Sequence, residues 1–212
     1  MSNKWFYIHT FNLILIYIVG VCGIAFTSET HQALFLQLTP LNLIVTTIFT
    51  LLFHSIWNRN FISSAILIFL SGFFIEVIGV KTHLIFGNYW YGNTLGLKLL
   101  EVPVLIGLNW FLLIYIIATS FQKIKNNFLF AIVCAATMTF LDIFIEPIAI
   151  KLNFWQWQNS IIPMQNYVAW FIISFFLFLF FRKVNKNLSN RFSIIVLAIQ
   201  FLFFTILNLL LK

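Results

Sequence analysis

Three carboxylates lie inside apolar stretches of the sequence, where a charged side chain is unusual. Of the 212 residues only five are acidic, and Glu76, Asp142 and Glu146 fall within apolar runs. A carboxylate in the hydrocarbon of a bilayer is costly even on the mildest insertion scale, so each of the three is a candidate functional residue.

The spacing of two of these residues suggests acid catalysis. Asp142 and Glu146 are four residues apart and therefore lie on one face of a helix. Two like charges this close in low dielectric should not both be ionised, so at least one carboxyl is expected to carry a proton. A neutral carboxylic acid can act as a general acid. The alternative is that these groups hydrogen-bond helices together or lie in interfacial water.

Glu76 and Glu146 occupy equivalent places in two copies of one pattern. The sequence FIEVIGVK at 74–81 aligns with FIEPIAIK at 144–151. An aromatic cluster follows each copy, and after it comes a proline with Trp-Phe seven residues further on, at Pro103 and Pro163. This pattern predicts an internal repeat of helical hairpins in parallel orientation, with units at about 61–121 and 127–182.

Aromatic and amide side chains near the two glutamates are candidates for substrate binding. Trp and Tyr at a membrane boundary are commonly anchors, but rings that wall a pocket can stabilise a cation, and the sequence leaves both readings open. The amides could hold a water or bridge helices. The candidate set is Tyr89, Trp90, Tyr91, Asn109, Trp110, Trp155, Trp157, Gln165, Asn166, Tyr167 and Trp170.

The elements that must position these residues are membrane-spanning helices. With 62% hydrophobic and 8% charged residues, the chain is predicted to be an all-α polytopic membrane bundle, in one domain over 1–212. The segment 81–100 is expected to be re-entrant or interfacial. Seven spans are predicted, at about 5–26, 39–57, 61–80, 101–121, 127–150, 162–182 and 192–211.

The basic residues favour a cytoplasmic N-terminus in the cell membrane. That orientation puts Lys4, Arg59, Lys123, Lys125, Arg182, Lys183, Lys186 and Arg191 inside, and Lys81, Lys98, Lys151 and Lys212 outside. The basic residues form no stripe, so nucleic-acid binding is not expected. No metal-ligand spacing, Walker loop, Asp-rich motif or nucleophile elbow is present.

Two blocks of the sequence resemble a known family. The first contains E-x-x-G-V-K-T from Glu76 and F-G-x-Y-x-Y from Phe86. The second contains E-P-I-A from Glu146, W-x-W from Trp155 and I-P-x-Q-N-Y-x-x-W from Ile162. Together, over roughly 73–171, they resemble carotenoid biosynthesis membrane proteins that include carotenoid 1,2-hydratases of the bisanhydrobacterioruberin hydratase type. His83 departs from the family pattern, which often has glycine there.

The resemblance implies an integral membrane enzyme that adds water across the terminal 1,2 double bond of an acyclic carotenoid end group, without metal or organic cofactor. Its partners would be the carotenoid, water and membrane lipid, and association with other carotenoid enzymes stays open. We expect Glu146, with Asp142 beside it, to donate the proton and Glu76 to position or deprotonate water, although the reverse assignment is also open. The alternatives are an end-group cyclase, or a small transporter or lipid-binding membrane protein that uses the glutamates as a proton relay.

Overall fold

The computed structural model describes residues 3–186 and 188–211, so Lys212, which entered the charge balance, lies outside the described residues. The chain is 74% helical, which confirms the all-α prediction. The described residues form eight helices: α1 (Asn3–Ala25), α2 (Glu29–Gln37), α3 (Thr39–Leu52), α4 (Arg59–Thr82), α5 (Leu105–Ser120), α6 (Asn127–Lys151), α7 (Met164–Val184) and α8 (Ser193–Leu210).

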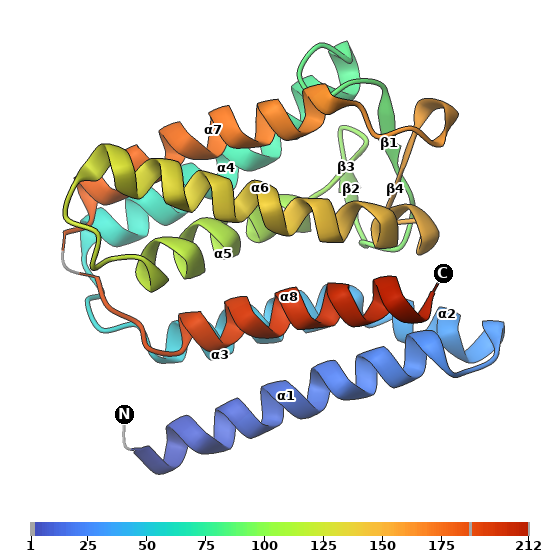
Figure 1. Ribbon diagram of the computed structural model, residues 1–212, viewed down its shortest axis with the longest axis horizontal. Coiled ribbons are helices and arrows are strands. Elements are labelled where there is room, and N and C mark those ends of the chain that lie inside the picture. Colours follow the sequence, from blue (N-terminus) through green and yellow to red (C-terminus); the bar gives the residue numbers. More distant parts are fainter. Residues whose placement is uncertain (1–2, 187, 212) are drawn as a thin grey trace.

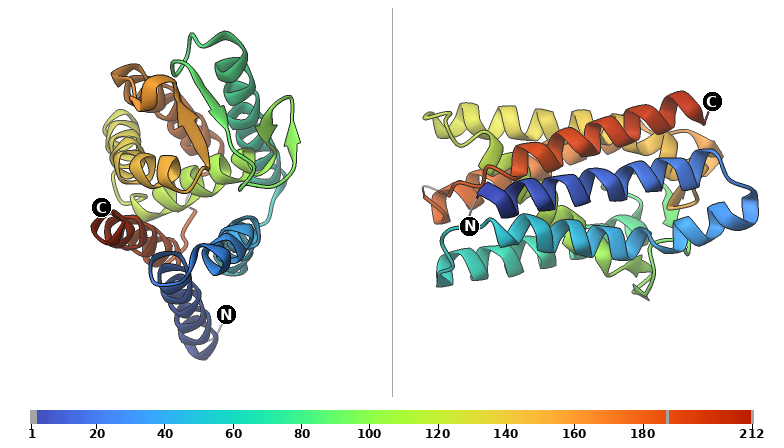
Figure 2. Two further views of the ribbon diagram at one scale, coloured as in Figure 1. Left: turned by 90° about the vertical axis from the view of Figure 1, so that its right-hand side faces the viewer. Right: turned by 90° about the horizontal axis from the view of Figure 1, so that it is seen from below.

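The helices lie side by side along one direction, and successive passes alternate in direction (Figures 1 and 2). The N-terminal end of α1 lies at one end of the bundle, and all the strands lie at the other (Figure 1). Both α4 and α6 run toward the end with the strands, so Glu76 and Glu146 come close to it from two different helices.

The long apolar helices make this a multi-pass membrane protein. Five of them, α1, α4, α6, α7 and α8, are long and apolar enough to cross a membrane, and the α2–α3 pair, bent by 41°, would be a sixth. The predicted number of seven is not confirmed, because α5 has only 16 residues and falls short of that length. Helix α2 was not predicted from the sequence; it precedes the predicted span at 39–57, and the chain bends between α2 and α3 just before Pro40.

The short helix α5 is the centre of the bundle. Every residue from Trp110 to Thr119 is buried, and α5 contacts α3, α4, α6, α7 and α8. Such all-round burial explains why its sequence is apolar on every side. The first turns of α5 carry Asn109 and Trp110 toward the end of the bundle that holds the strands.

The segment predicted to be re-entrant or interfacial contains short strands at the end of the bundle. Its strands are β1 (Tyr89–Tyr91) and β2 (Lys98–Leu99); β2 pairs with β3 (Val102–Pro103), and β1 pairs antiparallel with β4 (Trp155–Trp157). The one-turn 3₁₀ helix η1 (Gln158–Ser160) follows β4. The β1–β4 ladder ties the two halves of the chain together.

Gly92 permits the close approach of the two segments that carry this ladder. Its backbone N–H donates to the Phe154 carbonyl at 2.9 Å, and a Cβ atom at this position would lie 1.9 Å from the carbonyl oxygen of Asn153. Only glycine fits there without moving the backbone.

We therefore expect Gly92→Ala to destabilise the protein by about 3 kcal/mol, the upper end of the usual cost of overpacking. Thermal unfolding of the purified protein in detergent measures this. Gly20→Ala in α1 is the matched control, because its Cβ would meet Phe203 at an ordinary 3.5 Å, and its melting temperature should not fall. Equal melting temperatures for the two variants would contradict the prediction.

Candidate active site

Glu76 of α4 is held by three hydrogen-bond donors. Its side chain is only 3% exposed. Oε2 accepts from the hydroxyls of Tyr89 at 2.6 Å and Tyr91 at 2.8 Å, and Oε1 accepts from the Trp110 indole N–H at 3.1 Å. One turn earlier, a Cβ atom on Gly72 would lie 2.4 Å from Trp110, so glycine makes room for this indole to reach Glu76.

Glu146 of α6 is held in the same way by three donors from the second half of the chain. Oε2 accepts from the indole N–H groups of Trp155 at 2.9 Å and Trp157 at 2.7 Å. Oε1 accepts from the Asn166 amide at 3.0 Å, and this amide also donates to Asp142 Oδ2 at 3.0 Å. Asn166 therefore links the two carboxyls of α6.

Asp142 differs from the two glutamates in its hydrogen bonding. It is fully buried, and its Oδ1 atom has no hydrogen-bond partner within the part of the chain that the structure describes. A buried acceptor without a donor is rare, and a proton on this oxygen would turn it into a donor instead.

The β1–β4 pairing brings the two glutamate sites together. Tyr89 lies opposite Trp157 and Tyr91 opposite Trp155, with ring centroids 5.0 and 6.0 Å apart. Side chains alternate between the faces of a strand, so these four rings share the inner face. The middle residue of each strand, Trp90 or Gln156, lies on the other face.

All three carboxyls line one small cavity, whose volume is about 30 Å³. This space is large enough for a water molecule, and its carboxyl and amide groups provide polar partners. The stacked rings of Trp110 and Trp170, 4.6 Å apart, form part of the wall. The remaining wall residues are Phe86, Tyr89, Tyr91, Ile106, Asn109, Ile145, Trp155, Trp157 and Asn166.

The tyrosine hydroxyls of the cavity remain donors. Burial, and after it the negative charge of Glu76, raises the pKa of both Tyr89 and Tyr91 well above the ordinary tyrosine value. Both hydroxyls therefore keep their protons at any physiological pH and hold Glu76 as hydrogen-bond donors.

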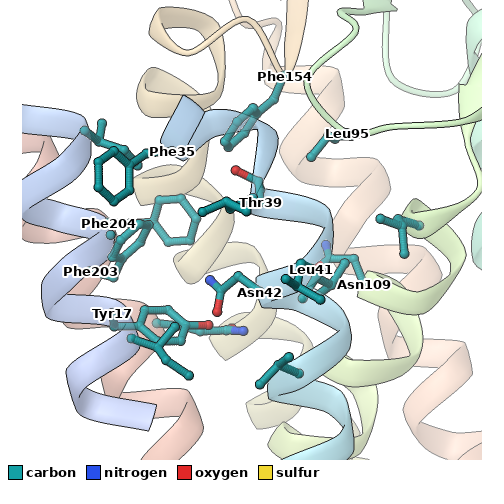
Figure 3. Close-up of a pocket in the computed structure, with 18 of the residues that line it drawn as sticks. Tyr17, Phe35, Thr39, Leu41, Asn42, Leu95, Asn109, Phe154, Phe203 and Phe204 are labelled. Atoms are coloured by element: carbon teal, nitrogen blue, oxygen red, sulfur yellow. The ribbon is translucent and has the colours of Figure 1, made fainter. Parts of the chain in front are cut away.

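A much larger, mostly apolar pocket of about 490 Å³ adjoins this cavity (Figure 3). The two spaces share four wall residues, Ile106, Asn109, Ile145 and Trp155. Among the described residues, the Asn109 amide makes no hydrogen bond, so it is available at the junction. Leu15 and Val19 of α1 and Leu41 of α3 are about half exposed, so the pocket reaches the outer surface of the bundle.

Most of the predicted site residues meet at this place. Besides the three carboxylates, the cavity wall contains Tyr89, Tyr91, Asn109, Trp110, Trp155, Trp157, Asn166 and Trp170. These positions come from four helices, α4, α5, α6 and α7, and from the two strands β1 and β4.

Three predicted substrate-binding residues lie outside both spaces. Trp90 is 50% exposed because strand alternation turns it outward. Gln165 and Tyr167 flank the inward Asn166 on α7, and a helix turns neighbouring side chains about 100° away. Gln165 donates instead to the backbone carbonyls of Leu84 and Ile85, and so fastens the segment that follows α4.

The large pocket was not predicted from the sequence. The polar residues Asn42 and Gln200, which lie in apolar runs, were the available signal. The glycine that the family often has at position 83 has a structural reason. His83 is the residue that ends α4, and its φ of 59° lies in the left-handed region, where glycine is usual.

Within the part of the chain that the structure describes, no three His, Cys, Asp or Glu side chains gather as metal ligands would.

Fold and site together define a multi-pass helical membrane protein with a buried carboxyl site beside an apolar pocket. The family of carotenoid biosynthesis proteins matches residues 37–212, so this chain belongs to that family and has a role in carotenoid biosynthesis. No curated protein and no solved structure matches the chain. Helix α1, and all of α2 except Gln37, precede the matched residues.

Proposed function

We propose that this protein adds water across the terminal 1,2 double bond of an acyclic carotenoid end group. The observation that carries the proposal is the convergence of three buried carboxyls on a water-sized cavity beside an apolar pocket. Hydration of such an alkene needs a proton donor, walls that tolerate a tertiary cation, and one water molecule held nearby.

The hydrogen-bond pattern favours Asp142 as the proton donor. Glu76 and Glu146 each accept three hydrogen bonds, which favours the ionised form of a carboxyl. Asp142 accepts one hydrogen bond and lies on the same helix face as Glu146, so a proton is best placed on its free Oδ1. This refines the expectation from sequence, in which the donor was Glu146 with Asp142 beside it.

The proposed reaction balances without any further reagent. The proton of Asp142 adds to C2 of the end group, and the positive charge develops on the tertiary C1. The oxygen of a water molecule bonds to C1, and Glu76 accepts the proton that this water loses. Relay of that proton back to Asp142 restores the site, and the sum is the addition of one water.

The cavity wall is suited to a short-lived cation. The negative charges of the ionised Glu76 and Glu146 stabilise the positive charge of the cation. The rings of Trp110 and Trp170 add their π-faces to this stabilisation in a low-dielectric site. Within the described parts of the chain, no Lys or Arg side chain lies in the wall. The Asn109 amide, at the junction with the apolar pocket, can orient the attacking water.

The large pocket would hold the polyene that follows the reacting end. Its wall is mostly apolar and reaches the lipid-facing surface, so a carotenoid can enter from the bilayer without crossing water.

We further propose that units 61–121 and 127–182 are copies of one hairpin. The chain would form one domain in the cell membrane, with its N-terminus in the cytoplasm. The proposed reaction needs no cofactor.

Expression in a lycopene-producing bacterial host tests the reaction. We expect the pigment to gain the mass of one water at a terminal end group, as measured by chromatography and mass spectrometry. Unchanged or cyclised pigment, in cells whose membranes contain folded protein, would overturn the proposal.

A further inference from the structure

The large pocket contains a polar group of side chains that the proposed reaction does not use. This polar triad consists of Tyr17 from α1, Asn42 from α3 and Gln200 from α8. Figure 3 shows the Tyr17 hydroxyl and the Asn42 amide close together on one side of the pocket. Both touch Thr46 Oγ1, which lies 3.4 Å from the Tyr17 hydroxyl and donates to Asn42 Oδ1 at 3.4 Å.

Gln200 is the member of the triad that points to a ligand. It is only 6% exposed, and its Oε1 atom is buried. Among the residues that the structure describes, this Oε1 atom has no hydrogen-bond partner. Buried amides are nearly always paired, because desolvation without a partner is unfavourable. A buried acceptor is thus unused in the wall of an apolar pocket.

We propose that the polar triad binds the hydroxyl group of an elongated isoprenoid alcohol whose hydrocarbon chain fills the pocket. A hydroxyl can donate to Gln200 Oε1 and at the same time accept from an amide N–H of Gln200 or Asn42. An ether or ketone would leave Oε1 unpaired, since neither can donate. A carboxylate or phosphate is disfavoured, because no Lys or Arg of the described residues lines the pocket.

This inference rests on the proposed function for its substrate class, an acyclic carotenoid, and adds that the ligand carries an alcohol. The ligand has then already passed through a reaction that installs oxygen on an isoprenoid chain, either a hydration or a hydroxylation. Tyr17 precedes the residues matched by the family, so one wall of this binding site comes from α1, outside the matched region.

The test compares the binding of lycopene and 1-hydroxylycopene, which differ by hydration of one end. Binding to purified protein is followed by quenching of tryptophan fluorescence, since Trp155 lines the pocket. Asp142→Asn is used so that turnover does not obscure affinity. We expect the alcohol to bind about tenfold more tightly, the effect of a hydrogen bond in a dry site.

Gln200→Leu should remove this preference, so that lycopene and 1-hydroxylycopene bind with equal affinity. Asn42→Leu and Tyr17→Phe should reduce it in the same direction, so the inference does not depend on the folding of one variant. Val45→Ala is the matched control: it shortens an apolar wall residue and should weaken both ligands alike.

Equal affinity of the two pigments for the unsubstituted triad, or a preference that survives in Gln200→Leu, would overturn the inference, because the triad would then only hold water or pack. Failure of the hydration proposal would look different. It would appear as pigment that gains no water in the host, whereas the binding preference would persist.

Discussion

Replacing Asp142 by Asn is expected to lower the rate of hydration by about 10²–10⁴-fold, the usual contribution of a general acid. The amide keeps the size of the carboxyl and can still accept from Asn166, so the loss would come from the missing proton and not from repacking. The rate is measured as the appearance of hydrated pigment in membranes supplied with lycopene.

Glu101→Gln is the matched control for this substitution. Glu101 pairs with Lys81 at 2.6 Å on the exposed end of the bundle and does not line the cavity. Its removal should leave the rate unchanged. An Asp142→Asn variant as active as this control would show that another group donates the proton.

Replacing Glu76 by Gln should also lower hydration by about 10²–10³-fold, but at a different step. Protonation of the alkene by Asp142 is retained, whereas the water that attacks C1 loses its proton acceptor. The cation then returns to an alkene by losing a proton from a neighbouring carbon.

Deuterium separates the two steps. In membranes suspended in D₂O, the Glu76→Gln variant should return substrate that carries deuterium at C2 without gaining water. Asp142→Asn should return unlabelled substrate. If the Glu76→Gln variant shows no exchange, Glu76 takes part in protonation, and the opposite assignment of the two roles is correct. If both variants remain fully active, the acid-catalysis mechanism is wrong.

The amino-acid sequence determined the class of protein and the chemistry-bearing residues. Long apolar runs can satisfy their backbone in a bilayer only as helices, so the all-α bundle followed from composition and run length. Glu76, Asp142 and Glu146 stood out for a related reason: carboxylates are rare in such runs, and the repeated pattern placed two of them in equivalent positions.

Only the tertiary structure decided which neighbours each carboxyl has. Three-residue strands are too short for a pattern of their own to predict, and the partner of Tyr89-Trp90-Tyr91 lies more than sixty residues away. That pairing, and not membrane depth, turns Trp90 outward and the other four rings toward the glutamates.

The same limit applies to the apolar pocket and to the polar triad in its wall. Hydropathy records how apolar a helix is but not which helices pack together, and α1, α3 and α8 meet only through long-range packing. Gln200 therefore looked like one polar residue in an apolar helix. It gained a chemical meaning only when folding placed it beside Tyr17 and Asn42, with its Oε1 atom left without a hydrogen-bond partner among the described residues.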